Sequence, residues 1–103
     1  MDSETTLNSA IEFANRAAAM FHPQEVVLFG SQVNGKSNKD SDIDIAVVFD
    51  LLDNTRLEKA FQLDKLRRNI DTRIEPVLVV QKNNDSSGFY NHIKATGKIL
   101  YRE

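Results

Sequence analysis

The hydrophobic period of the chain changes repeatedly between that of a helix and that of a strand. Over residues 3–21, apolar side chains recur at three- and four-residue steps, which predicts a helix that ends before Pro23. Residues 26–29 form a short apolar run, and residues 43–49 begin as an alternation of isoleucine with aspartate. Both patterns are typical of strands. Because 103 residues suffice for one domain, we expect a single domain spanning residues 1–103.

A second long helix is predicted after residue 54. Thr55 and Glu58 match the capping-box pattern, in which two side chains satisfy the first backbone amides of a helix. The apolar spacing that follows gives this helix a broad apolar face, to which Leu57 and Phe61 belong. We expect that face to be buried against the sheet.

The rest of the chain completes an alternating order of elements. Residues 72–80 predict a third strand, and residues 89–95 predict a last helix that Gly97 ends in a left-handed conformation. A short helix is expected after Ser31. The order is then α-β-α-β-α-β-α, which predicts an α/β (α+β) fold with a small mixed sheet and helices packed on it.

The composition excludes several classes of protein. Thirteen basic and fifteen acidic residues give a net charge of −2, so strong binding to nucleic acid through phosphate neutralisation is not expected. The absence of cysteine excludes disulfides and thiol chemistry. Apolar stretches are too short to cross a bilayer, and we expect a cytoplasmic protein with no membrane partner.

Two aspartates at the start of the second strand carry the first indication of function. Asp42 and Asp44 are separated by one residue, so on a strand they share a face with Cα atoms roughly 6.6 Å apart. Carboxylates that close repel each other unless a cation lies between them, and oxygen ligands favour Mg²⁺ or Mn²⁺. A pair of such ions serves displacement at phosphorus. An isolated Asp-x-Asp is also compatible with turn chemistry alone.

A glycine and a serine directly after the first strand strengthen the phosphate interpretation. Gly30 allows the backbone to approach a phosphate closely, and Ser31 places a hydroxyl at the start of the predicted short helix. The two strands therefore bring hydrogen-bond donors for a phosphate beside the candidate metal ligands, Asp42 and Asp44.

Together these residues resemble the signature of the DNA polymerase beta-type nucleotidyltransferase superfamily, and in particular its minimal nucleotidyltransferase branch. The resemblance rests on Gly30-Ser31, Gly35 and residues 41–47, and it covers nearly the whole chain. It implies the nucleotidyltransferase fold and the Mg²⁺-dependent transfer of a nucleoside monophosphate, AMP in the first place, from ATP or another NTP to an acceptor hydroxyl. Asp42 and Asp44 match the aspartates that hold two Mg²⁺ ions, or Mn²⁺. Gly30, Ser31 and Ser41 match the nucleotide-binding positions.

The same resemblance implies a third carboxylate on a neighbouring strand, which completes the metal site and helps to deprotonate the acceptor. Glu75, between Ile74 and Pro76, fits the apolar flanking pattern better than Asp71 does, although both share a strand face. The alternative for Glu75 is an ion pair with Arg73. 

One position departs from the family pattern. Members commonly carry an arginine just before the position of Gly35, where this chain has Asn34. The residues left to contact the triphosphate are Lys36, Lys39 or Arg73.

The partners follow from the resemblance as well. A chain of this length has no second domain to hold an acceptor, and minimal domains of this branch often pair with a small helical toxin of the HEPN type. The first hypothesis is therefore an antitoxin that adenylylates its toxin, as a protein adenylyltransferase. The alternative is a non-catalytic binding module that neutralises the toxin by contact. A small-molecule nucleotidyltransferase of the antibiotic-modifying kind is less favoured. The sequence leaves open whether the chain forms a homo- or hetero-oligomer.

Overall fold

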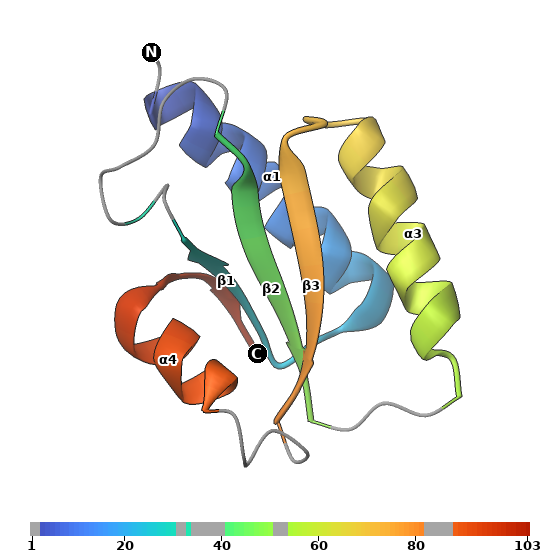
Figure 1. The fold of residues 1–103 in the computed structure, drawn as a ribbon. Helices are drawn as coiled ribbons and strands as arrows, with labels where there is room; N and C mark the ends of the chain where they lie inside the picture. The colour runs from blue at the N-terminus through green and yellow to red at the C-terminus, as the bar shows by residue number, and fades with distance from the viewer. Residues whose placement is uncertain (1–2, 31–32, 34–40, 51–53, 82–87) are drawn as a thin grey trace.

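The computed structural model describes most of the chain, namely residues 3–30, 33, 41–50, 54–81 and 88–103. The described residues form three helices and four strands (Figure 1). In chain order these are α1 (Ser3–Phe21), β1 (Glu25–Phe29), β2 (Ile43–Phe49), α3 (Arg56–Arg68), β3 (Ile74–Val80), α4 (Phe89–Thr96) and β4 (Lys98–Arg102). The predicted fold class, a small mixed sheet with helices packed on it, is confirmed. Apart from Val33, the short helix predicted after Ser31 lies outside the described residues.

The four strands form one sheet in the order β3-β2-β1-β4 (Figure 1). β2 and β3 are parallel, whereas β1 is antiparallel to both β2 and β4. Strand β4 was not expected from the sequence. Its three apolar residues are consecutive and lack the alternation that marks a strand with one solvated face, so nothing in the pattern of residues 98–102 separates a strand from a tail.

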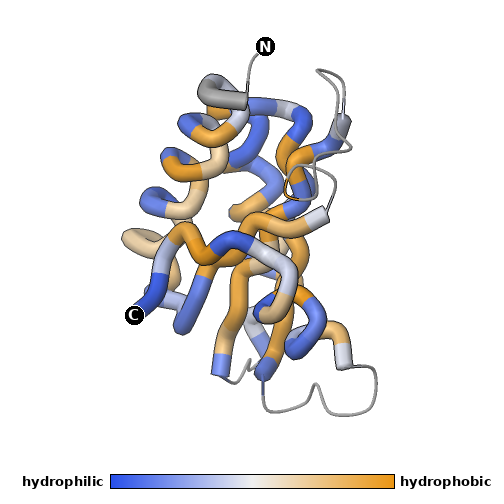
Figure 2. Tube along the Cα trace, turned by 90° about the vertical axis from the view of Figure 1, so that its left-hand side faces the viewer, coloured by the Kyte–Doolittle hydropathy of each residue, from blue (hydrophilic) through white to orange (hydrophobic). Residues whose placement is uncertain are grey.

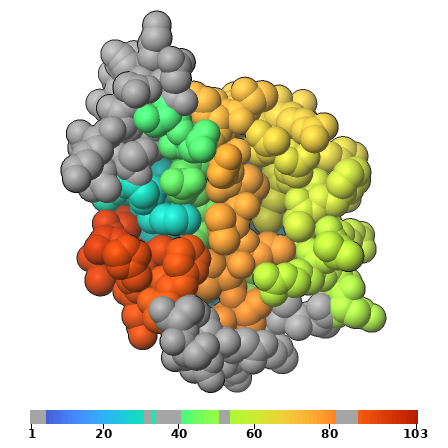
Figure 3. All heavy atoms as spheres, viewed as in Figure 1, coloured from blue at the N-terminus to red at the C-terminus, as the bar shows by residue number. Residues whose placement is uncertain are grey.

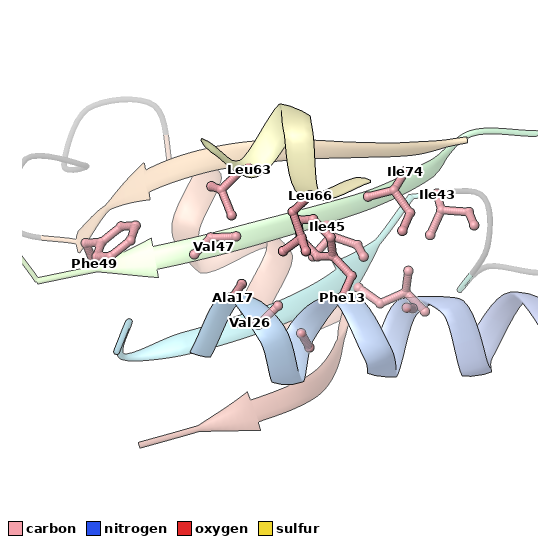
Figure 4. Close-up of a cluster of buried hydrophobic side chains, with 13 residues drawn as sticks. Phe13, Ala17, Val26, Ile43, Ile45, Val47, Phe49, Leu63, Leu66 and Ile74 are labelled. Atoms are coloured by element: carbon pink, nitrogen blue, oxygen red, sulfur yellow. The ribbon is translucent and has the colours of Figure 1, made fainter. Parts of the chain in front are cut away.

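One face of the sheet is covered by α1 and α3, which together with the strands enclose the main core (Figure 4). Phe13 of α1 and Leu63 of α3 are fully or almost fully buried there. The strands contribute Ile43, Ile45 and Ile74, each with no exposed surface. Figure 2 shows the hydrophobic stretches running through the strands, while α1 alternates hydrophobic and hydrophilic residues as an amphipathic helix does.

α3 departs from prediction on its outer side. Only Leu63 and Leu66 are buried in this helix, whereas Leu57 is 85% and Phe61 62% exposed, so the broad buried face predicted for it is wrong. The spacing of apolar residues fits two adjacent stripes of the helix, and the sequence does not tell which stripe contacts the sheet. The Thr55 side chain makes no capping hydrogen bond either; its backbone is near-helical, and its hydroxyl accepts a hydrogen bond from Lys59 Nζ at 2.6 Å.

The opposite face of the sheet is covered in part by α4, which packs over β1. A second core cluster joins Ile93 of α4 to the strands, and it consists of Val27, Ala46, Val48, Val79 and Ile93. Gly97 follows α4 with φ −90° and ψ 176°, an extended rather than left-handed conformation, so this part of the prediction is wrong. Glycine is required there by packing, because a Cβ would lie 2.6 Å from Val27 Cγ1 and 2.8 Å from the Leu28 carbonyl oxygen.

Candidate active site

The first half of β2 sets the direction of the two aspartates. Ile43 and Ile45 are buried in the core beneath α1 and α3. Because successive side chains of a strand alternate between faces, Asp44 points to the opposite face, the one that α4 covers only in part. Asp42 stands just before the strand and is exposed, while Asp44 is half-buried. The hydrophobic core thus fixes the orientation of Asp44.

The pairing of the strands places an acid of β3 beside this position. Asp44 lies opposite Phe29 of β1 on one side and opposite Glu75 of β3 on the other. Residues paired across neighbouring strands project to the same face, with Cβ atoms about 5 Å apart. Glu75 is exposed. Asp42, Asp44 and Glu75 therefore form a group of acids on the open face, called the carboxylate cluster below.

Mutual repulsion is the main electrostatic property of this cluster. Partial burial raises the pKa of Asp44, and the negative charge of Asp42 raises it further. The pKa of Glu75 is raised chiefly by the charge of Asp42, then by desolvation, by Asp44 and by a hydrogen bond with Asp42, while Arg67 acts in the opposite direction. The carboxyl groups of Asp44 and Glu75 thus take up a proton more readily than they would alone.

Asp71, the other candidate for the third carboxylate, has a different environment. Arg73 Nη2 lies 2.8 Å from Asp71 Oδ2, and the Arg73 Nε and backbone amide both donate to Asp71 Oδ1. The hydrogen bonds from the Arg73 side chain hold the pKa of Asp71 below its usual value. Ser9 and Thr6 of α1 contact this pair, Ser9 through Asp71 and Thr6 through Arg73. The structure therefore groups Glu75 with the aspartates, and it pairs Asp71 with Arg73 beside α1.

Gly30 follows β1 and adjoins the cluster. Its φ of +84° is in the region that favours glycine, and a Cβ at this position would overlap the carboxylate of Asp44. Its carbonyl oxygen accepts a hydrogen bond from the Val33 amide at 3.0 Å, which turns the chain after the strand. Glycine is thus required here both by backbone conformation and by the proximity of Asp44.

Of the other nucleotide-binding candidates, Ser41 is described and half-buried next to Asp42. Ser31 lies outside the described residues. So do the loop positions that the sequence analysis weighed, which are Asn34, Gly35, Lys36 and Lys39.

The donors of the carboxylate cluster suit a hard divalent cation. All of them are carboxylate oxygens, the ligands that Mg²⁺ and Mn²⁺ prefer, and their mutual repulsion would be relieved by a cation. Within the described part of the chain, no three acid, histidine or cysteine side chains are already gathered at metal-binding positions. The three carboxylates thus suit a divalent cation chemically, and a bound cation would draw them closer together.

The surface around the cluster includes residues that sequence reasoning did not assign to the site. Figure 3 shows atoms of β2 and β3 exposed between α4 and α3. Phe29 and Phe89 border this surface on the side of α4, with ring centroids 5.7 Å apart. On the side of α3, Arg67 donates hydrogen bonds to Asp64 and to the Thr72 carbonyl, both at 2.8 Å. That these residues lie near the carboxylate cluster depends on the order of strands in the sheet, and the sequence carries no local signal for that order.

A family model described as Polymerase beta, Nucleotidyltransferase matches residues 11–103, which is nearly the whole chain. The chain belongs to the polymerase beta nucleotidyltransferase family. A search of curated protein sequences gives no significant match. Within the described residues, no helix of this nucleotidyltransferase-family chain has both the length and the apolar character needed to cross a membrane.

Solved structures with the same fold include a protein of Sulfolobus solfataricus described as a nucleotidyltransferase. It has a TM-score of 0.67 and 21% identity, and the match covers 100% of this chain and 90% of that chain. At this identity the similarity concerns the fold.

Other similar structures are toxin–antitoxin complexes. A complex solved with AMP-PNP has a TM-score of 0.63 and 28% identity, covering 90% of this chain and 73% of that chain. A complex of a tri-AMPylated Shewanella oneidensis HEPN toxin with its MNT antitoxin has a TM-score of 0.59 and 25% identity, covering 99% and 74%. The MntA-HpeT pair, solved as a double aspartate-to-glutamate mutant with one residue between the two positions, has a TM-score of 0.64 and 25% identity, covering 100% and 75%.

Proposed function

We propose that this chain is a Mg²⁺-dependent nucleotidyltransferase that transfers AMP from ATP to a hydroxyl group of a helical toxin of the HEPN type. The observation that carries the proposal is the carboxylate cluster beside Gly30, on the face of the sheet that α4 leaves open. Membership of the family supports the reaction class, and the toxin–antitoxin complexes among the similar structures support the partner.

In this proposal Asp42, Asp44 and Glu75 hold the cation, and Gly30, Ser31 and Ser41 contact the nucleotide. When bound, Mg²⁺ neutralises charge on the triphosphate and makes the α-phosphorus easier to attack. Gly30 lets the backbone of the turn approach the phosphates without a side chain in the way.

Glu75 is the residue proposed to take the proton. The acceptor oxygen forms a bond to the α-phosphorus, the bond from that phosphorus to the bridging oxygen breaks, and pyrophosphate leaves. The proton of the acceptor hydroxyl passes to the Glu75 carboxylate. Its place in the sheet suits it to this step, because Glu75 lies opposite Asp44 on the open face, beside the proposed position of the nucleotide.

The test is transfer of labelled AMP from ATP to a HEPN toxin co-expressed with this chain, with Mn²⁺ binding followed by calorimetry. Asp42→Asn combined with Asp44→Asn is expected to abolish Mn²⁺ binding and transfer, because the metal loses its central ligands. Asp64→Asn is the control, since this carboxylate lies on α3 and pairs with Arg67 and Arg68. Mn²⁺ affinity that survives the double substitution would contradict the proposal.

The second candidate function, a binding module that neutralises the toxin by contact, is favoured by a different observation. Leu57 and Phe61 are strongly exposed on α3, and Lys65 Nζ lies 5.6 Å above the Phe61 ring. Exposed apolar residues of this kind are typical of protein contact surfaces. A wild-type chain that binds and neutralises the toxin without modifying it would establish this function instead.

A further inference from the structure

One phenylalanine lies beside the carboxylate cluster, and a second phenylalanine packs on the first. Phe29 precedes Gly30 and is paired with Asp44, so its ring projects to the same face as that carboxylate. Phe89, the first residue of α4, meets the Phe29 ring edge to face, with centroids 5.7 Å apart and an interplanar angle of 84°. Phe89 remains 36% exposed. These two residues, called the aromatic pair below, form an apolar boundary of the proposed site.

The floor next to this pair is apolar as well. One step further along the strands, Val27, Ala46 and Val77 are paired across the sheet in the same way as Phe29, Asp44 and Glu75. Ala46 is fully buried, and Val77 is half-buried at the edge of the second core cluster. The row that contains Phe29, Asp44 and Glu75 is thus followed directly by a row of apolar side chains, of which Val77 is the one that a ligand can reach.

The position of Phe89 is fixed by contacts on the rest of α4. Glu25 of β1 accepts hydrogen bonds from Tyr90 Oη at 3.2 Å and from Lys94 Nζ at 3.1 Å. Ile93 is buried between them. A helix held to the sheet along its length presents its first aromatic ring at low conformational cost, which favours binding of a flat ligand.

We propose that the aromatic pair is the subsite for the nucleobase, with the base lying over Val77 and its ring in contact with Phe89. This inference rests on the proposed function, because it takes the phosphates to lie at Gly30 and the carboxylate cluster. A nucleotide held there directs its base to one side of the phosphates, and the aromatic pair offers an apolar surface on the β1 side of the acids. Contact with an aromatic face favours any base over none, and the larger purine rings over pyrimidines.

Binding of two probes separates the base from the phosphates. Mg²⁺–ATP carries a base, whereas Mg²⁺–tripolyphosphate carries phosphates only. Phe89→Leu keeps an apolar side chain but removes the ring, and it is expected to weaken ATP binding roughly 5- to 150-fold, the range for loss of one base–aromatic contact. Tripolyphosphate binding, measured by the same calorimetry, is expected to stay unchanged. Phe89→Tyr is expected to retain ATP affinity.

Phe61→Leu is the matched control, because it removes an exposed aromatic ring from α3 and should leave both affinities unchanged. An equal loss of affinity for ATP and for tripolyphosphate in Phe89→Leu would overturn the inference, because the substitution would then act through the fold or through the phosphate site. An unchanged ATP affinity in Phe89→Leu would overturn it directly. If the wild-type chain binds tripolyphosphate as tightly as ATP, a base subsite is excluded and the proposed function stands. If it binds neither probe, the base subsite and the proposed function are both overturned.

Discussion

One buried glutamate and the carboxylate cluster lie on the same face of this sheet in opposite surroundings. Glu25, at the start of β1, is only 6% exposed and accepts hydrogen bonds from Tyr90, Lys94 and Arg102. Asp44 and Glu75, at the start of β2 and β3, have each other and Asp42 as neighbours. One carboxylate is thus compensated by the protein itself, while the cluster concentrates negative charge.

The difference shows how the fold separates a structural acid from a candidate functional one. Burial of a carboxylate is tolerated when donors and cations surround it, and at Glu25 those donors tie α4 and β4 to β1. At the carboxylate cluster the same sheet holds acids close together, and their mutual repulsion favours a cation or a proton at this point. The following predictions test each side of this comparison.

The largest effect is expected at Glu75. Glu75→Gln nearly keeps the shape of the side chain but removes the proposed proton acceptor, so transfer of labelled AMP to the toxin is expected to fall about 10²- to 10⁴-fold, while ATP binding changes little. Asp71→Asn is the control, because Asp71 pairs with Arg73 instead of joining the cluster. If Asp71→Asn abolishes transfer while Glu75→Gln remains active, the third carboxylate is Asp71.

The sequence predicted the elements that contain these acids better than it predicted their neighbours. The bounds of α1 agree with the helical period of its apolar residues. The alternation of Ile43 and Ile45 with the aspartates predicted the face on which Asp44 lies, because that alternation follows directly from burial of the isoleucines in the core. That Glu75 lies opposite Asp44 depends on which strands are neighbours and in which register. No local pattern encodes this.

Other misses have the same origin in long-range packing. The network of Glu25 joins residues more than 60 positions apart, and Glu25 looks like an ordinary polar strand end in the sequence. Gly97 is required by the proximity of Val27 and Leu28, not by its own backbone conformation. The exposed stripe of Leu57 and Phe61 was assigned to the core because period alone does not distinguish a core from a contact surface.

A medium effect is expected at the compensated acid. Glu25→Gln keeps the shape but removes the charge that binds Lys94 and Arg102, and it is expected to lower the free energy of unfolding by about 1 to 3 kcal/mol in urea titrations. The lower half of this range is favoured, since both basic side chains can reach water. Glu12→Gln is the matched control: Glu12 pairs with Arg16 on the surface of α1, so its loss should cost below about 0.5 kcal/mol. Equal losses in the two variants would remove the distinction drawn for Glu25.

The smallest effect is the dependence of stability on pH at the carboxylate cluster. The pKa values of Asp44 and Glu75 are raised in the folded chain, so between the ordinary values near pH 4 and the raised ones the folded state binds more protons than the unfolded state. This contribution makes the metal-free protein less stable as the pH rises through that window. The lowered pKa of Asp71 acts in the opposite direction, because its stabilisation is lost only as the pH falls through the lowered value.

The contribution of the cluster is isolated by comparing wild type with a chain carrying Asp44→Asn and Glu75→Gln, in urea titrations with EDTA from about pH 4 to pH 7. The variant is expected to gain stability relative to wild type as the pH rises, by less than about 1 kcal/mol because Asp42 and Glu75 are exposed and screened. Added Mg²⁺ is expected to stabilise wild type at pH 7 and not the variant. A difference between the two chains that stays constant with pH would show that the acids of this cluster do not repel one another, and the contrast with Glu25 would then lose its electrostatic basis.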